Sequence, residues 1–211
     1  MNVFVLNTGR CGSTTFARAC THIANFTTGH ESQRALLGDA RLDYPASHIE
    51  VDNRLNWFLG RLERRYGVDA TYVHLVRDAE ATARSFAKRY SRGIIRAYRH
   101  AILPGLSLDA EPMAVSLDYC DTVNSNIEQF LRDKPRALRF ELERAQRDFP
   151  AFWSLVGAEG DLEAALAEFG EKHNATRRSI RQGVDRPAPL TRGLRKLRRV
   201  IRTLPEMIRD A

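Results

Sequence analysis

Strand-like and helix-like segments alternate three times within the first ninety residues of this 211-residue chain. Short runs rich in apolar and β-branched residues occupy positions 3–6, 47–52 and 70–76. Each run is followed by a segment with apolar residues at helical spacing, at positions 16–23, 55–62 and 79–90. Because parallel strands need a crossover connection, this alternation predicts a parallel sheet with helices on both faces. With a further strand expected at 136–142, we predict a single α/β domain whose sheet has about four or five strands.

The segments between these elements are less regular. Positions 27–46 show weak periodicity, so we expect a long loop of a functional or mobile kind. Positions 93–134 are expected to be mostly helical with breaks near Pro104 and Pro112, and shorter helices are expected within 148–157 and 161–169. The proline-containing segment 185–189 predicts a boundary between a domain at 1–185 and a basic helical tail at 186–211.

The first strand leads into a glycine-containing loop, Asn7-Thr8-Gly9-Arg10-Cys11-Gly12-Ser13-Thr14-Thr15. Glycine allows a tight turn and a close approach of the backbone to a ligand. Amides at the start of the following helix point at that ligand, and the helix dipole favours an anion there. Arg10 adds a cation, and the hydroxyl groups after Gly12 add hydrogen-bond donors. The pattern predicts a phosphate or sulfate site formed by Gly9, Arg10, Cys11, Gly12, Ser13, Thr14 and Thr15.

The loop departs from the ATP-binding pattern G-x-x-x-x-G-K-[ST]. Asn7 stands at its first glycine position, and Ser13 stands at its lysine position. The order Arg10-Cys11-Gly12-Ser13-Thr14 instead resembles the 5′-phosphosulfate-binding loop of sulfotransferases that use 3′-phosphoadenosine 5′-phosphosulfate (PAPS), in which lysine is usual at the position of Arg10. A P-loop-type nucleotide kinase or NTPase and a non-catalytic nucleotide-binding protein stay open as alternatives.

A second resemblance to this family lies at the end of the third strand. Arg77 follows that strand, and Ser85 lies two helical turns beyond Asp78, so we expect both side chains on one side of the helix. A guanidinium and a hydroxyl suit a terminal phosphate. Their spacing is similar to that of the arginine and serine that bind the 3′-phosphate in PAPS sulfotransferases, although Ala79 replaces a common proline. A weaker resemblance at 138–150 extends the likeness from residue 3 to about residue 170.

The resemblance implies the P-loop-like sulfotransferase fold and sulfuryl transfer from PAPS, which leaves adenosine 3′,5′-bisphosphate (PAP), without a metal ion. The acceptor would be a hydroxyl, less readily an amine, on a glycan, a lipid or a small metabolite. Arg10 would stabilise charge on the leaving nucleotide. The general base is expected to be Glu31, which follows Arg10 at the distance seen in carbohydrate sulfotransferases. Asp52 at a strand end and His30 are the alternatives.

Composition bears on where such a protein works. The hydrophobic fraction of 43% and the charged fraction of 28% are those of a soluble globular chain. The three cysteines show neither a disulfide framework nor metal-ligand spacing. The chain has no apolar run of about 18 residues, and its N-terminus enters a strand at once. These features favour a cytoplasmic protein.

The basic residues are concentrated near the C-terminus. Positions 186–211 carry a net charge of +6, against +7 for the whole chain. Leucine and isoleucine recur there at spacings of three and four, which predicts an amphipathic helix. We expect this tail to pack on the domain or on a second copy of the chain, or to make peripheral contact with the inner face of a membrane. Nucleic acid is a disfavoured partner, since nothing else in the chain supports it.

Overall fold

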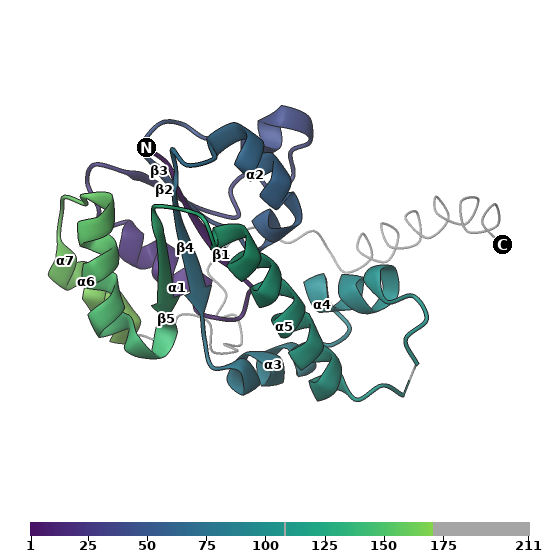
Figure 1. Ribbon diagram of the computed structural model, residues 1–211. Helices are drawn as coiled ribbons and strands as arrows, with labels where there is room; N and C mark the ends of the chain where they lie inside the picture. Colours follow the sequence, from purple (N-terminus) through teal and green to yellow (C-terminus); the bar gives the residue numbers. More distant parts are fainter. Residues whose placement is uncertain (108, 171–211) are drawn as a thin grey trace, which may run out of the picture. The chain divides into compact units, whose positions relative to one another are not determined.

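The computed structural model describes residues 1–107 and 109–170, which form an α/β domain around one five-stranded sheet (Figure 1). All neighbouring strands are parallel, and their order is β2-β3-β1-β4-β5. The strands are β1 (Val3–Asn7), β2 (Thr27–His30), β3 (His48–Val51), β4 (Thr71–Val76) and β5 (Ala137–Glu141). The α-helices are α1 (Ser13–Cys20), α2 (Leu59–Tyr66), α3 (Ala79–Ala87), α4 (Gly93–Ala97), α5 (Pro112–Leu131), α6 (Ala145–Val156) and α7 (Leu162–Ala167).

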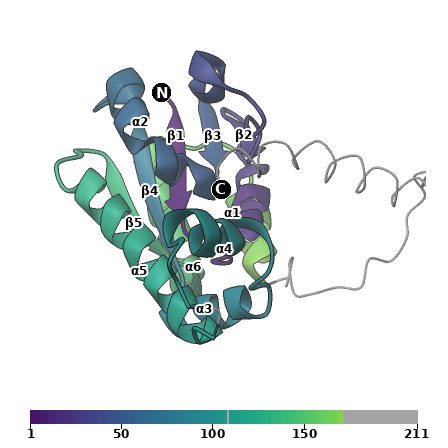
Figure 2. The ribbon, with the colours of Figure 1, turned by 90° about the vertical axis from the view of Figure 1, so that its right-hand side faces the viewer.

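Helices cover both faces of the sheet and bury one hydrophobic core on each side (Figures 1 and 2). Along β1, Val3 and Val5 point into the core beneath α1, α6 and α7, which includes Phe16, whereas Phe4 and Leu6 point into the core beneath α5. This alternation follows from the two-residue period of a strand. A strand buried on both faces is mostly apolar, and the apolar runs at 3–6 and, apart from His74, at 72–76 made β1 and β4 recognisable in the sequence.

The predicted α/β fold is confirmed, but the expected loop at 27–46 is wrong in part. Its first residues form β2, which pairs with β3 at the edge of the sheet, and Gly38–Leu42 form a 3-10 helix. The sequence Thr27-Thr28-Gly29-His30 is half exposed and has no apolar alternation, so periodicity could not detect it. His30 therefore lies at the end of a strand rather than within a free loop.

The other elements differ from the predictions mainly at their ends. Helix α1 begins three residues earlier than expected, at Ser13, so the hydroxyl residues after Gly12 form its first turn. The helix expected at 55–62 is split into a 3-10 helix at Asn53–Phe58 and α2. Residues 98–102 continue α4 as a π-helix. Helix α6 spans twelve residues, with Pro150 inside it, and is longer than the short helix expected there.

All five carboxyl ends of the strands lie at one edge of the sheet, where ligands bind in open parallel sheets. Within the described residues, no helix is long and apolar enough to cross a membrane. The predicted boundary at residue 185 and the basic tail at 186–211 lie outside the described residues.

Candidate functional site

The loop between β1 and α1 runs through left-handed backbone conformations at three positions. The φ angles are +81° at Gly9, +62° at Arg10 and +88° at Gly12. A Cβ atom on Gly12 would lie 2.6 Å from Cδ1 of Leu142, so no larger residue fits there without a shift. Arg10 adopts a conformation that is unfavourable for a side chain, and such outliers are typical of functional sites. The predicted glycine turn is therefore tightly specified by its surroundings.

Asn7 holds this loop in shape. Its fully buried side-chain oxygen accepts hydrogen bonds from the Gly9 amide at 2.9 Å and from the Cys11 thiol at 3.5 Å. From outside the loop, the Asn56 amide donates to the Asn7 carbonyl at 2.6 Å, and the Tyr119 hydroxyl donates to the Thr8 carbonyl at 2.9 Å. Asn7 stands where the ATP-binding pattern has its first glycine. Its side chain stabilises the turn through these hydrogen bonds.

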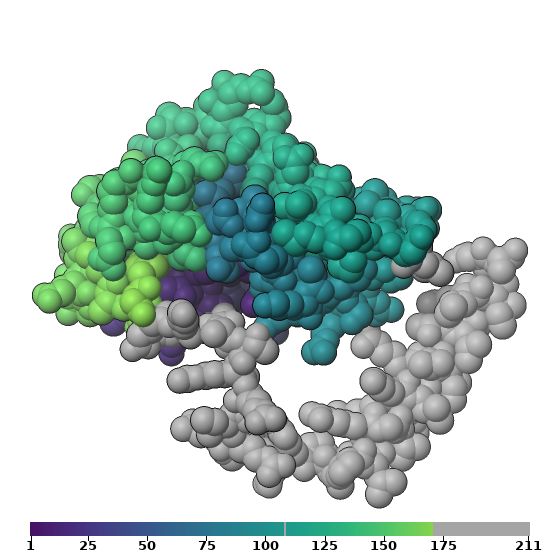
Figure 3. Space-filling view, turned by 90° about the horizontal axis from the view of Figure 1, so that it is seen from below, coloured from purple at the N-terminus to yellow at the C-terminus, as the bar shows by residue number. Residues whose placement is uncertain are grey.

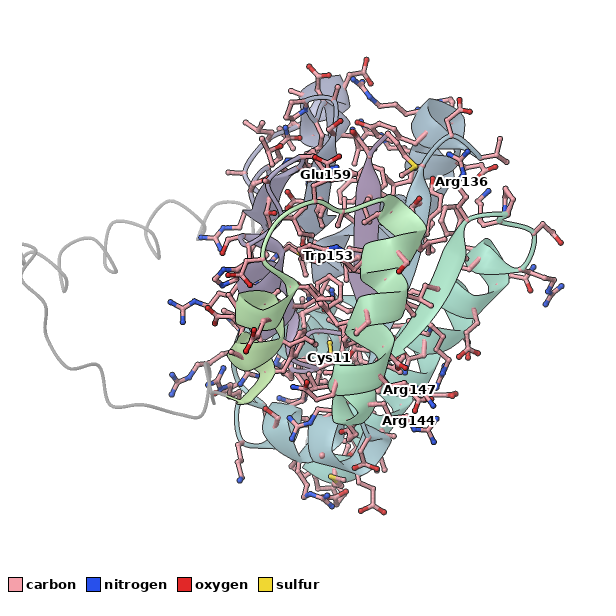
Figure 4. The ribbon with its side chains drawn as sticks, turned by 90° about the vertical axis from the view of Figure 1, so that its left-hand side faces the viewer. Cys11, Arg136, Arg144, Arg147, Trp153 and Glu159 are labelled. Atoms are coloured by element: carbon pink, nitrogen blue, oxygen red, sulfur yellow. The ribbon has the colours of Figure 1, made fainter. Side chains whose placement is uncertain are left out.

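Cys11 belongs to the core rather than to the ligand surface. Its sulfur lies in the interior, whereas Arg144, which directly precedes α6, and Arg147 in that helix point outward (Figure 4). Burial raises the pKa of the Cys11 thiol to about 11, so the thiol stays protonated at neutral pH. Of the predicted loop residues, Cys11 can therefore offer its backbone but not its side chain to a ligand.

The two predicted phosphate-binding motifs meet in space. The Arg10 guanidinium donates to the Ser85 hydroxyl in α3 at 3.0 Å, and Arg77 at the end of β4 donates to the Arg10 carbonyl at 3.3 Å. Burial, followed by the nearby cations Arg89 and Arg77, lowers the pKa of Arg10. Glu143 accepts from the Asp78 amide at 3.2 Å and lies 3.9 Å from Arg77. Arg10, Arg77 and Ser85 thus form a cationic corner beside the glycine loop, where positive charge exceeds negative charge.

His30 lies against the same loop. Its Nε2 atom is 3.3 Å from the Ser13 hydroxyl in the first turn of α1, and its side chain is exposed. Thr14 and Thr15 follow in that turn and are half-buried. Figure 3 views the molecule from the carboxyl ends of the strands and shows the purple N-terminal residues at the surface, between the green C-terminal helices and the teal segment of α3 and α4. An imidazole at this edge can reach a ligand held by the loop.

Glu31 follows β2 with a left-handed backbone, at φ +53°. Its carboxylate pairs with Arg54 at 2.7 Å and with Arg34 at 3.0 Å, and 18% of its side chain is exposed. Burial opposes ionisation of this carboxyl, but hydrogen bonds from Arg54 and Arg34 outweigh it and lower the pKa of Glu31. A carboxylate held by two guanidinium groups is a weak proton acceptor in this conformation.

A buried polar cluster under β2 fixes the position of the His30–Glu31 corner. The fully buried Glu50 carboxylate accepts hydrogen bonds from the Ser32 amide at 2.8 Å and from the Ser32 hydroxyl at 2.5 Å. His48 lies 3.1 Å from the same carboxylate. A Cβ atom on Gly29 would lie 2.3 Å from that carboxylate, so glycine is required for the approach. Polar residues under an edge strand gave no signal in the sequence.

Asp52 is in the interior and away from solvent. Its side chain has no exposed surface, and it pairs with the buried Arg41 guanidinium at 2.5 Å. The Arg54 amide donates to the other oxygen at 2.7 Å, so Asp52 caps the 3-10 helix that carries Asn56. Burial raises the pKa of Asp52 despite the nearby Arg41. Asp52 lies at the strand end, as expected. Its carboxylate, however, is enclosed in the interior, where it holds the 3-10 helix next to the loop.

The structure therefore brings the loop, Arg77, Ser85 and His30 together at one edge of the sheet, with Glu31 next to them. The supporting residues Asn7, Asn56, Tyr119 and Glu143 were missed in the sequence. Of these, Asn7 had a usable signal there, since a polar side chain stands at the first glycine position of the loop. No group of three His, Cys, Asp or Glu side chains in the described part of the chain could hold a metal ion.

No family model matches the sequence, and no curated protein matches it. Among solved structures, the sulfotransferase domain from the curacin biosynthetic pathway is 17% identical, with a TM-score of 0.55 over 81% of this chain and 77% of that chain. Mouse sulfotransferase SULT7A1, solved in complex with PAP, is 14% identical, with a TM-score of 0.53 over 80% of this chain and 61% of that chain. At these identities the likeness concerns the fold alone. The described residues have the α/β fold of these two sulfotransferases.

Proposed function

We propose that this protein is a PAPS-dependent sulfotransferase that transfers a sulfuryl group to an acceptor hydroxyl. The observation that carries the proposal is the meeting of the Arg10 loop with Arg77 and Ser85. The Arg10 side chain reaches Ser85 at 3.0 Å across 75 positions of sequence. Two cations and a hydroxyl beside an open glycine loop suit a nucleotide that carries anionic groups at both its 5′ and 3′ positions. The fold shared with two sulfotransferases supports the proposal.

PAPS supplies the sulfuryl group, and the protein supplies position and charge. Sulfuryl transfer, like phosphoryl transfer, has a loose transition state, so catalysis rests mainly on alignment and electrostatic stabilisation. The loop amides with Arg10, Ser13 and Thr14 would hold the 5′-phosphosulfate, and Arg77 with Ser85 would hold the 3′-phosphate. The Arg10 guanidinium would stabilise negative charge on the departing nucleotide.

The 3′-phosphate contact predicts a nucleotide preference. PAP should bind roughly 10–100-fold more tightly than 5′-AMP without magnesium, because a charge-assisted contact contributes about 1.5–3 kcal/mol. Arg77→Ala should remove most of this preference. Arg84→Ala, at an exposed arginine that pairs with Glu80, is the control and should leave it intact. Calorimetry with both nucleotides tests this. Equal affinities in the wild type, or tight binding only of ATP with magnesium, would favour the NTPase alternative.

For the general base we propose His30, which is exposed and contacts the loop, with Glu31 holding Arg54 and Arg34 beside it. His30→Gln should lower kcat by about 10²–10⁴-fold, the usual contribution of a general base, whereas Glu31→Gln should have a smaller effect. If Glu31→Gln is inactive and His30→Gln is active, the base is Glu31.

A further inference from the structure

The domain contains a strongly basic segment, although the total charge of the domain is close to zero. Residues 81–107 contain six lysine and arginine residues and no aspartate or glutamate. Elsewhere in the described domain, acidic residues balance or exceed basic ones, so the positive charge is gathered on α3, α4 and the turn between them. The six residues are Arg84, Lys88, Arg89, Arg92, Arg96 and Arg99.

Two of these six cations contact a residue that is close to them in the sequence. Arg84 forms an ion pair with Glu80, and Arg99 stacks on the Tyr90 ring at 3.6 Å. Lys88, Arg89, Arg92 and Arg96 have no carboxylate of the described residues within ion-pair distance. Like charges one helical turn apart repel each other, so a set of unpaired cations costs stability unless an anion joins them.

The segment is held rigidly on the domain. Ile95 and Tyr98 are buried against α5, where the Tyr98 hydroxyl donates to Asp118 at 2.5 Å. On the opposite, exposed side, Arg92, Arg96 and His100 follow each other at intervals of one turn. They line an open cavity of about 480 Å³ together with Ser91, Gly93 and Ala97. The cations are thus presented by a fixed element rather than by a free loop.

The cavity is continuous in sequence and charge with the nucleotide corner. Arg89 lies at the end of α3, where the Arg92 amide donates to its carbonyl at 2.9 Å. Arg89 is also close enough to Arg10 to perturb it electrostatically. Both α3, which carries Ser85, and α4 lie on the α5 side of the sheet (Figure 2). The cations of this segment therefore begin near Arg10, at Arg89, and continue along the chain to Arg92 and Arg96, which line the cavity.

We propose that this cavity is an acceptor subsite, and that the acceptor is anionic, with carboxylate, sulfate or phosphate groups near the hydroxyl that is modified. Arg92 and Arg96 would pair with these groups, and His100 and Ser91 would donate hydrogen bonds. The inference rests on the proposed sulfuryl transfer, because it names the acceptor class of that reaction. It concerns residues 91–100 of the described domain.

Direct binding to the full-length protein saturated with PAP tests the proposal without requiring turnover. The probes are hexagalacturonate, a chondroitin sulfate hexasaccharide and neutral maltohexaose. At least one of the two anionic probes should bind, with an affinity that falls as salt is added, and maltohexaose should not. Arg92→Gln/Arg96→Gln should weaken this binding by about tenfold or more. Arg64→Gln/Arg132→Gln removes two charges from exposed positions elsewhere and should have little effect.

Three results would overturn the subsite. They are equal losses in the two double variants, equal binding of charged and neutral saccharides, and tighter binding of a short DNA duplex through the same two arginines. PAP affinity in Arg92→Gln/Arg96→Gln should match the wild type, which excludes unfolding as the cause. If the wild type does not bind PAP but keeps saccharide binding that depends on Arg92 and Arg96, the anion site is supported and the proposed sulfotransferase activity is contradicted.

Discussion

Arg10→Ala should lower kcat/KM for sulfuryl transfer by roughly 10²–10³-fold, the effect of removing one group that stabilises developing charge. The variant should also bind PAP more weakly, since the same guanidinium is half of the cationic corner with Arg77. Arg10→Lys should retain part of the activity, because it keeps the charge but not the planar donor that reaches Ser85. The rate is measured with radiolabelled PAPS and an acceptor found by screening.

The control for this prediction is Arg84→Ala, one residue away from Ser85 in the same helix. Arg84 pairs with Glu80 at 2.7 Å on the exposed surface, so its removal should change kcat/KM by no more than about twofold. A comparable loss in both variants would mean that general positive charge, and not the position of Arg10, matters. Full activity in Arg10→Ala would contradict the assigned role of the loop.

The second large effect concerns stability. Arg41→Met should reduce the free energy of unfolding by about 3–5 kcal/mol, because it leaves the buried Asp52 carboxylate without its partner. Arg41 is 2% exposed and Asp52 is 0% exposed, and their atoms lie 2.5 Å apart. Methionine keeps most of the volume, so the loss reports the charge rather than a cavity. Chemical denaturation of both proteins gives the difference.

The pH dependence of this loss has a definite sign. Burial already raises the pKa of Asp52 in the wild type, and removing Arg41 should raise it further. A carboxyl whose pKa is higher in the folded state stabilises the fold when protonated, and that contribution is lost as the pH rises through the folded pKa. The destabilisation by Arg41→Met should therefore be larger at pH 7.5 than at pH 5. A loss independent of pH would assign it to packing.

Two further variants separate the ion pair from other effects. Arg41→Met/Asp52→Asn should recover much of the stability, because neither charge remains buried. Arg65→Met removes the partner of Asp43 from an exposed pair, with side-chain exposures of 37% and 68%, and should cost less than about 1 kcal/mol. A double variant no more stable than Arg41→Met alone would mean that Asp52 is not the source of the loss.

The fold class could be predicted from the sequence, and so could the segments that form the candidate site. Strands that are buried on both faces, such as β1 and β4, are mostly apolar, so they are visible as local runs. The glycine loop and the Arg77–Ser85 spacing are local patterns as well. The cluster of cations at 81–107 is also a local pattern in the sequence. The charge summed over the whole domain does not reveal it, because acidic residues elsewhere balance these cations.

Which of the candidate side chains are exposed beside the loop and which are enclosed became visible only in the tertiary structure. The sequence favoured Glu31 as the base, with Asp52 and His30 as alternatives. Asp52 is enclosed by Arg41, which is eleven positions away, and Glu31 is held by Arg54, whereas His30 faces Ser13. β2 exists because β3 offers it hydrogen bonds, not because its own residues favour a strand. Burial and ion pairing depend on partners distant in the chain, so no local pattern of residues could have predicted them.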